Sequence, residues 1–197
     1  MQIVFFGAGT IAQVHVDAFS TIDGVSLAGV CSRRRSSAET LVTHASKAGL
    51  CNQSHMPPRV TTDLDDLLMS SRPDCLIIAT PNDVRLSPIE RACDMVRAGK
   101  STLRAIACEK PLGRSGDEAA AIRSAISGSG QHEVYLENQV FMPAVTFLRH
   151  WLDTRVRSGD RLHSVRLSLS HGGPGLQWFF GSERTGGGVL RDLGCHA

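Results

Sequence analysis

The sequence has no long apolar run. None of its segments approaches the roughly 18 consecutive apolar residues that a membrane-spanning helix needs. The chain also lacks the charged start and apolar stretch of a secretory leader, because a short strand-like segment, Gln2–Phe6, begins almost at once. We therefore expect a cytoplasmic protein without a membrane partner.

Cysteine and histidine motifs are missing as well. The six cysteines contain no Cys-x-x-Cys spacing, and several lie in apolar runs, as Cys75 does between Asp74 and Ile78. This pattern indicates buried reduced thiols rather than a disulfide framework or a zinc site. The eight histidines show no ligand spacing either, so we expect no metal.

A large excess of charge of either sign is the third absence. The net charge is +2, and the one basic run, Arg33–Arg35, is short and local. Such a balance provides no field for binding a nucleic acid or an anionic membrane surface. With 42% hydrophobic and 20% charged residues, the composition is that of an ordinary globular protein.

The N-terminus combines an apolar strand with a glycine-rich turn. Ile3–Phe6 is continuously apolar, which is typical of a strand covered on both faces. Residues 7–12 follow as a G-x-G-x-x-A pattern, and a helix is predicted over Ile11–Phe19. Between a strand and a helix, this pattern favours a dinucleotide site over an ordinary turn.

Each residue of the pattern has a physical role. Gly7 permits the tight turn, and Gly9 lets the backbone approach a pyrophosphate. Ala12 lets the helix pack closely on the strand. Thr10 and Ile11 lie at the start of that helix, where N–H groups and the helix dipole attract phosphates.

The end of the second predicted strand, Val25–Cys31, indicates which cofactor fits. About 20 residues past the glycine turn, where an acid would hold the ribose of NAD, the chain has Ser32 followed by Arg33 and Arg34. No carboxylate repels a 2′-phosphate there, and each charge-assisted bond from arginine contributes on the order of 1.5–3 kcal/mol. We expect NADP, with NAD as the alternative. A solvated basic loop without a ligand is the other interpretation.

Strands and helices alternate over the first two thirds of the chain. Further strands are predicted at Cys75–Ala79, Leu103–Ala107 and Val134–Leu136. Further helices are predicted at Ser36–Leu50, Ser87–Ala98 and Glu118–Ile126, and a short helix is predicted to start at Asp63. A polar loop is predicted at Cys51–Arg59. This alternation is typical of an α/β fold with a doubly wound parallel sheet. We assign a Rossmann domain to residues 1–132. Residues 133–197 then form the incomplete start of an α+β open-sheet domain for substrate binding or dimerisation.

Polar residues follow three of the predicted strands. They are Thr80-Pro81-Asn82, Glu109-Lys110-Pro111 and Glu137-Asn138. In an open α/β sheet, ligands bind outside the carboxyl ends of the strands, which is where Lys110 would lie. The alternatives are an exposed turn at Lys110 and an ordinary strand-to-helix cap at Asn82.

The pattern changes in the last third of the chain. Pro143–Arg157 predicts one long helix with proline at its start, and Leu162–Leu169 alternates as a strand with one covered face would. After the triple glycine at 186–188, Asp192 and His196 are four residues apart and would share one face of a helix. A carboxylate beside an imidazole is a candidate general acid/base pair; a capped helix with an incidental histidine is the alternative.

Taken in order, these motifs resemble the Gfo/Idh/MocA oxidoreductases, which include glucose-fructose oxidoreductase and inositol dehydrogenase. The resemblance extends over essentially all 197 residues. It implies a Rossmann domain followed by a larger open-faced sheet domain that usually dimerises, so we expect a homo-oligomer where that second domain is complete. It also implies hydride transfer between a nicotinamide and a hydroxyl-bearing carbon of a small sugar, polyol or cyclitol.

The resemblance also implies residue roles. Lys110 would lie beside the nicotinamide and the substrate, Asp192 would be catalytic, and His196 would be the general base. The residues expected to bind the cofactor are Gly7, Gly9, Thr10, Ile11, Ala12, Ser32, Arg33, Arg34, Thr80, Pro81, Asn82, Glu109, Lys110 and Asn138.

Three features depart from the family pattern. Arg85 stands where the family often has a histidine, Ser101–Ala107 is a few residues longer than the usual strand, and the chain ends at Ala197 whereas family members continue much further. A half-covered strand at 162–169 needs sheet neighbours. We therefore expect a truncated chain that binds cofactor but turns over poorly.

Two other functions remain open from the sequence. One is a dinucleotide-binding regulatory protein that has kept the Rossmann half and lost catalysis. The other is a nicotinamide-dependent lyase or glycosidase, which oxidises its substrate only transiently and leaves no net reduced cofactor.

Overall fold

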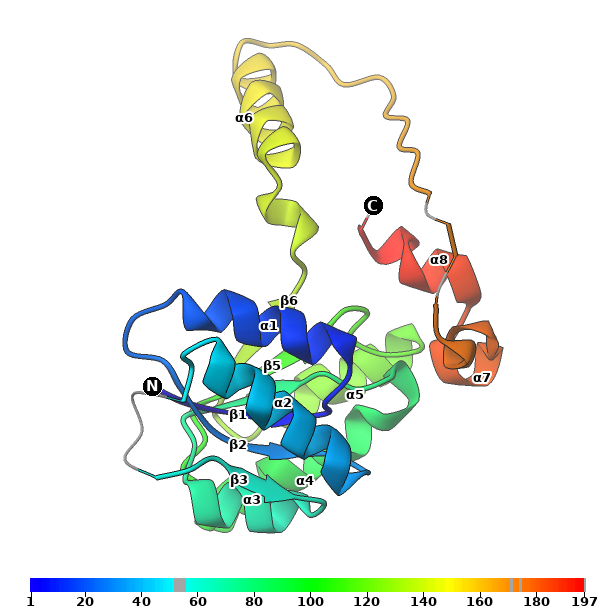
Figure 1. Ribbon diagram of the computed structural model, residues 1–197. Coiled ribbons are helices and arrows are strands. Elements are labelled where there is room, and N and C mark those ends of the chain that lie inside the picture. The colour runs from blue at the N-terminus through cyan, green and yellow to red at the C-terminus, as the bar shows by residue number, and fades with distance from the viewer. Residues whose placement is uncertain (52–55, 171, 174, 197) are drawn as a thin grey trace.

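A six-stranded parallel sheet forms the centre of the protein (Figure 1). The computed structural model describes residues 1–51, 56–170, 172–173 and 175–196. The strands are β1 (Gln2–Phe6), β2 (Ser26–Cys31), β3 (Arg59–Thr61), β4 (Cys75–Ile78), β5 (Ala105–Glu109) and β6 (His132–Leu136). Their order is β3-β2-β1-β4-β5-β6, which confirms the predicted doubly wound sheet. It continues through β6, and the predicted domain boundary after residue 132 stays a prediction.

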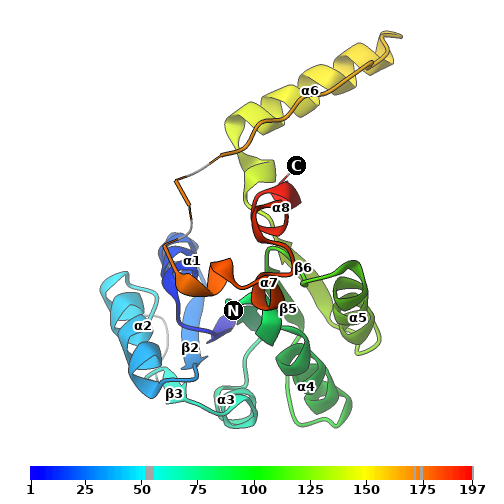
Figure 2. The ribbon, with the colours of Figure 1, turned by 90° about the vertical axis from the view of Figure 1, so that its right-hand side faces the viewer.

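Helices cover both faces of the sheet (Figures 1 and 2). Two of them, α1 (Thr10–Ser20) and α2 (Arg35–Lys47), pack on one face, and α3 (Leu64–Ser71), α4 (Leu86–Arg97) and α5 (Gly116–Ser127) pack on the other. Because successive side chains of a strand point to opposite faces, a strand between two helical layers needs an apolar residue at every position. In β1, Val4 packs toward α3 and α4, whereas Ile3 and Phe5 pack toward α1 and α2.

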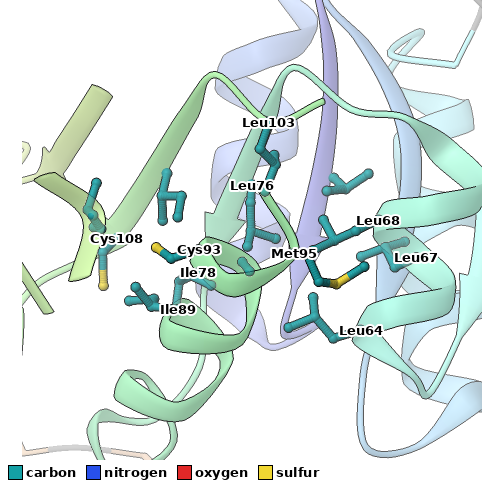
Figure 3. Close-up of a cluster of buried hydrophobic side chains, with 14 of the residues drawn as sticks. Leu64, Leu67, Leu68, Leu76, Ile78, Ile89, Cys93, Met95, Leu103 and Cys108 are labelled. Carbon is teal, nitrogen blue, oxygen red and sulfur yellow. The ribbon is translucent and has the colours of Figure 1, made fainter. Parts of the chain in front are cut away.

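The core on the α3–α4 side is built from long aliphatic side chains (Figure 3). Leu67 and Leu68 of α3 pack with Leu76 and Ile78 of β4 and with Met95 of α4, and all five are fully or almost fully buried. Burying a side chain of this size contributes about 1.5–3 kcal/mol. This cluster therefore holds β4, and the polar residues that follow it, firmly in place.

Side-chain caps define the starts of α3 and α5. Asp63 Oδ1 accepts a hydrogen bond from the Asp65 N–H at 2.8 Å, and Ser115 Oγ accepts one from the Glu118 N–H at 3.1 Å. Such caps satisfy backbone donors that the helix leaves unpaired, and each typically contributes about 1 kcal/mol.

Three sequence predictions about secondary structure were wrong. Arg59–Thr61 forms the edge strand β3, although a loop was predicted up to Arg59; three residues are too few to show a period. The fifth strand begins at Ala105 rather than Leu103. Residues 162–169 have no regular secondary structure, because no strand within the described residues pairs with them.

The chain leaves the sheet after β6 and then returns to it. The short helix η2 (Gln139–Phe141) leads into α6 (Pro143–Arg157), which projects away from the sheet as Figure 1 shows, and no described residue between 138 and 184 is buried. The predicted bounds of α6 are confirmed. Four short helices complete the return: η3 (Gln177–Phe180), α7 (Ser182–Thr185), α8 (Gly188–Asp192) and η4 (Gly194–His196).

A protein that spans a membrane by helices needs a long, apolar helix. Across the described parts of the chain, we find no helix with both the length and the apolar character that crossing a bilayer requires.

The side chains of β4, one of the two central strands, should contribute strongly to the stability of the sheet. Leu76→Ala removes a fully buried side chain from β4 and should lower the free energy of unfolding by about 2–5 kcal/mol, because a cavity remains. Chemical denaturation followed by circular dichroism measures this loss. The control is Val14→Ala in α1, where the side chain is 54% exposed and the change should stay within about 0.5 kcal/mol. Equal effects of the two substitutions would contradict the proposed core.

Candidate active site

The carboxyl ends of β1 and β4 lie side by side at the point where the sheet changes direction. From β1 the chain continues to β2 on one side, and from β4 it continues to β5 on the other. The crossover helices therefore diverge and leave a crevice between them. A cavity of about 710 Å³ lies there, lined by the strand-end loops and by part of the returning C-terminal segment.

The glycine turn forms one wall of this cavity. Gly7 has φ +106°, and a Cβ at this position would lie 2.4 Å from the Ala79 carbonyl oxygen, so only glycine fits. A Cβ at Gly9 would meet no heavy atom within 4 Å. Gly7 is thus required by the packing of the two strand ends, whereas Gly9 leaves open space in front of the α1 N-terminus.

The basic run divides into two parts. Arg35 Nε donates to Glu39 Oε1 at 3.1 Å and Arg35 Nη1 to the Val60 carbonyl at 3.3 Å, so this side chain is engaged within the fold. Arg33 and Arg34 are exposed, line the cavity with Ser32, and have no ion-pair partner among the described residues. Within the described part of the chain, the cavity end beyond β2 therefore carries two positive charges that no acid pairs with.

An ion pair closes the opposite end of the cavity. Lys110, directly after β5, donates through Nζ to Asp192 Oδ1 and to the Asp192 carbonyl, both at 2.9 Å. The two side chains are 22% and 20% exposed, and both residues line the cavity. Residues that lie 82 positions apart in the chain thus meet beside the glycine turn.

His196 is paired with Glu137. His196 Nδ1 lies 2.7 Å from Glu137 Oε2, and both side chains are more than 90% buried. The Glu137 carboxylate also accepts the Gln139 N–H at 2.8 Å. An ionised carboxylate only accepts hydrogen bonds, so a neutral His196 that donates from Nδ1 to Glu137 would leave Nε2 as an acceptor.

The sequence spacing suggested that Asp192 and His196 share one face of a helix, but the structure places them in two separate elements. Helix α8 ends at Asp192, and His196 belongs to the separate turn η4. The glycine at 194 in this short segment favours a break over a continuous helix. The Asp192 carboxylate consequently pairs with Lys110 and the His196 imidazole with Glu137.

Two further residues of the site were not recognised from the sequence. His15 Nε2 lies 2.7 Å from Glu109 Oε1, which joins α1 to the end of β5. Arg85 is buried beside the same strand end; in the sequence it stood out only as a departure from a family pattern. No spacing rule could have found His15, because its partner lies 94 positions further along the chain.

Polar contacts hold the returning segment against the strand ends. Asn82 Nδ2 donates to the Thr185 carbonyl at 3.0 Å, Arg184 Nε to Asp83 Oδ2 at 2.9 Å, and Arg114 Nη1 to the Glu183 carbonyl at 3.0 Å. This packing brings Trp178 and Phe179 to the cavity, where their rings stack 3.9 Å apart.

Glu137, Cys195 and His196 are the three residues of the described chain that could together hold a metal ion. One ligand atom from each lies within 4.8 Å of the other two. Burial raises the pKa of the Cys195 thiol, which keeps it protonated, and the nearby Lys110 charge only partly opposes this. That ammonium would also repel a bound cation, so the charges around these three residues disfavour a metal ion.

Comparison with known proteins identifies the family. Residues 1–133 match the family model described as "Oxidoreductase family, NAD-binding Rossmann fold". The chain belongs to the Gfo/Idh/MocA oxidoreductases. The resemblance of the sequence motifs to this family is thereby confirmed.

Several members of the family are similar to this chain. The 4-carboxy-2-hydroxymuconate-6-semialdehyde dehydrogenase of a Sphingobium species is 30% identical over 122 residues, 62% of this chain and 33% of the enzyme. The levoglucosan dehydrogenase of Pseudarthrobacter phenanthrenivorans is 30% identical over 123 residues, 60% of this chain and 30% of the enzyme. The crystal structure of GenD2 from gentamicin A biosynthesis in complex with NAD shares the fold, with a TM-score of 0.76 at 24% identity, and covers 100% of this chain and 51% of GenD2. The chain thus spans between about a third and a half of these proteins.

The glycine turn fits the dinucleotide of a Gfo/Idh/MocA oxidoreductase. Gly9 leaves the space that a pyrophosphate would fill, and Thr10 and Ile11 open α1, whose first N–H groups have no partner within the helix. Gly9, Thr10 and Ile11 would therefore be the residues of this turn that hold the cofactor pyrophosphate.

Most residues expected to bind the cofactor line the cavity. Those that do are Gly7, Gly9, Thr10, Ile11, Ser32, Arg33, Arg34, Thr80, Pro81, Asn82, Glu109 and Lys110. Ala12 is fully buried beneath the turn, as its packing role requires, whereas Asn138 is exposed and outside the cavity. His196 is also absent from the cavity lining. The individual roles stay predictions.

Substitutions at the two glycines should have different effects. Gly7→Ala should lower the midpoint of thermal unfolding, because its Cβ collides with the Ala79 carbonyl. Gly9→Ala should leave that midpoint nearly unchanged and weaken dinucleotide binding, because its Cβ occupies the open space. Thermal unfolding and cofactor fluorescence titrations on both variants provide the measurement. A destabilised Gly9→Ala that still binds cofactor would contradict this assignment.

Proposed function

We propose that this chain is the cofactor-binding part of an NADP-dependent oxidoreductase. The same chain also supplies the catalytic residues of that enzyme. The reaction is hydride transfer between the nicotinamide and a hydroxyl-bearing carbon of a sugar, polyol or cyclitol. The observation that carries this proposal is the Lys110–Asp192 pair, which faces the same cavity as the glycine turn. This pair supports a role for Lys110 as the cation that stabilises negative charge on a substrate oxygen.

The charges around the cavity match the needs of such a reaction. A bound nicotinamide would supply the hydride chemistry at the substrate carbon. The Lys110 ammonium stabilises the alkoxide oxygen, and Asp192 fixes its position through two hydrogen bonds. His196 is assigned the general-base role, with Nδ1 held by Glu137; because it does not line the cavity, this role requires its Nε2 to reach the substrate hydroxyl. Glu137 then stabilises the imidazolium that forms.

The basic end of the cavity supports NADP over NAD. Ser32 replaces the acid that would hold an unphosphorylated ribose, and Arg33 and Arg34 add positive charge at the same place. Ser37, in the first turn of α2, also lines this end. A 2′-phosphate would accept hydrogen bonds from these serine and arginine side chains, and the positive end of the α2 dipole would stabilise its charge.

The alcohol or carbonyl substrate is inferred from chemistry and from similarity. A sugar-like molecule offers hydroxyl groups to Lys110 and Asp192, and a CH-rich ring face to the stacked Trp178 and Phe179. The similarity to a levoglucosan dehydrogenase supports a sugar-derived substrate. Net formation of reduced cofactor would distinguish this reaction from that of a lyase or glycosidase.

Cofactor preference should depend on two arginines. NADPH should bind more tightly than NADH, and Arg33→Ala/Arg34→Ala should reduce that preference by at least about tenfold, since each charge-assisted bond is worth about 1.5–3 kcal/mol. The measurement is a fluorescence titration with each cofactor. Arg35→Ala is the matched control, because its guanidinium already binds Glu39 and Val60, and it should keep the preference. Equal binding of both cofactors by the unmodified chain would exclude the NADP assignment.

Turnover should depend on Lys110 far more strongly than cofactor binding does. In a screen of levoglucosan, inositols and related polyols with NADP, Lys110→Met should lower kcat at least about a hundredfold, as expected when an oxyanion-stabilising donor is lost. The cofactor dissociation constant should rise by a much smaller factor. A chain that binds NADPH but oxidises none of these compounds, alone or joined to a complete second domain, would instead support a dinucleotide-binding regulatory protein.

A further inference from the structure

Arg85 is a buried cation at the carboxyl end of the sheet. It begins α4 as the N-cap residue, and only 3% of its surface is exposed. Burial lowers the pKa of its guanidinium below the usual value, although Cys108 and Glu109 partly oppose this effect. Such a residue is costly to desolvate and is retained only where its hydrogen bonds compensate.

All hydrogen bonds of the Arg85 guanidinium within the described residues go to backbone carbonyls. Nε and Nη2 donate to the Thr80 carbonyl at 3.2 and 3.0 Å. Nη1 donates to the Glu109 carbonyl at 2.5 Å and to the Pro111 carbonyl, and Nη2 also donates to the Lys110 carbonyl at 3.2 Å. Among the described residues, it forms no ion pair with a carboxylate.

These carbonyls come from the two loops that border the catalytic end of the cavity. Thr80 follows β4, and the other three belong to consecutive residues at the end of β5. The main chain on both sides of Lys110 is therefore fixed from one direction by a single planar group. An ammonium could not replace it, because a lysine offers three donors from one point rather than a fork.

We infer that Arg85 is a positioning residue, which holds the Lys110 main chain at the place where its Nζ meets Asp192. This inference rests on the proposed role of Lys110 and adds to it. The Lys110 side chain has its own partner 2.9 Å away, but a flexible four-carbon chain reaches that partner in one geometry only if its backbone is fixed. Arg85 supplies that constraint through the carbonyl groups on both sides of the Lys110 Cα.

The reactivity of lysine amines tests the inference without cofactor or substrate. The chain has only three lysines, at 47, 100 and 110; the first two are exposed and serve as internal references. The protein is treated briefly with acetic anhydride, and the acetylation rate of each lysine is followed by mass spectrometry of peptides. Lys110 should react more slowly than both references, and Asp192→Asn should remove this protection.

Arg85→Ala should speed Lys110 acetylation about tenfold relative to both references, the effect of losing one strong charge-assisted bond. Arg85→Lys should speed it similarly. Arg91→Ala in the same helix is the control, because Arg91 binds Asp65 at the surface and the substitution should leave Lys110 protected. Guanidinium chloride at low concentration should restore protection in Arg85→Ala, whereas sodium chloride should not. Rescue by a denaturant cannot reflect a general gain in stability.

Several outcomes would overturn the inference. Wild-type Lys110 protection in a folded Arg85→Ala or Arg85→Lys would show that Arg85 does not position Lys110. Equal acceleration at all three lysines, failure of both variants to fold, or lack of guanidinium rescue would indicate a purely structural role. If the protection of Lys110 from acetylation depends on Arg85 but the chain binds neither NADPH nor NADH, the proposed function fails while the positioning effect stands.

Discussion

The parallel pairing of β1 with β4 is the constraint on which the rest of the site depends. Four residue pairs, from Ile3 with Cys75 to Phe6 with Ile78, set the register so that both strands end at one level. Gly7 then lies against the Ala79 carbonyl, and a side chain there would push the strands apart. The register thus determines where the glycine turn, the Thr80 loop and the Lys110 loop meet.

The C-terminal segment contributes to the site through polar contacts, in contrast to the apolar packing of the sheet. Residues 138–170 bury almost nothing, yet the returning residues bind Asn82, Asp83, Lys110 and Arg114. Close approach also matters, because a Cβ at Gly186 would lie 2.2 Å from the Arg114 carbonyl oxygen. The triple glycine therefore acts here as a docking element, which brings Asp192 and His196 to the end of the sheet.

Much of the fold and part of the site could be predicted from the sequence, for local reasons. Strands buried on both faces are apolar at every position, and a glycine turn between strand and helix has few other uses. The strand expected over 162–169 failed because a pattern shows an apolar face but not whether neighbours exist to pair with it. The partners of Asp192, His196 and His15 could not be found either, since they lie 82, 59 and 94 positions away in the chain.

Each acid of the site is paired with a different basic side chain. Glu109 binds His15 through Oε1 and accepts the Lys110 N–H through Oε2, Asp192 holds Lys110, and Glu137 holds His196. If Arg85 were paired with Glu109, one of these contacts would be lost. Because its guanidinium is satisfied by carbonyl groups instead, Arg85 adds a cation to the strand ends without drawing a carboxylate away from its partner. A buried arginine bound to the backbone therefore lets three acid-containing pairs lie side by side at one edge of the sheet.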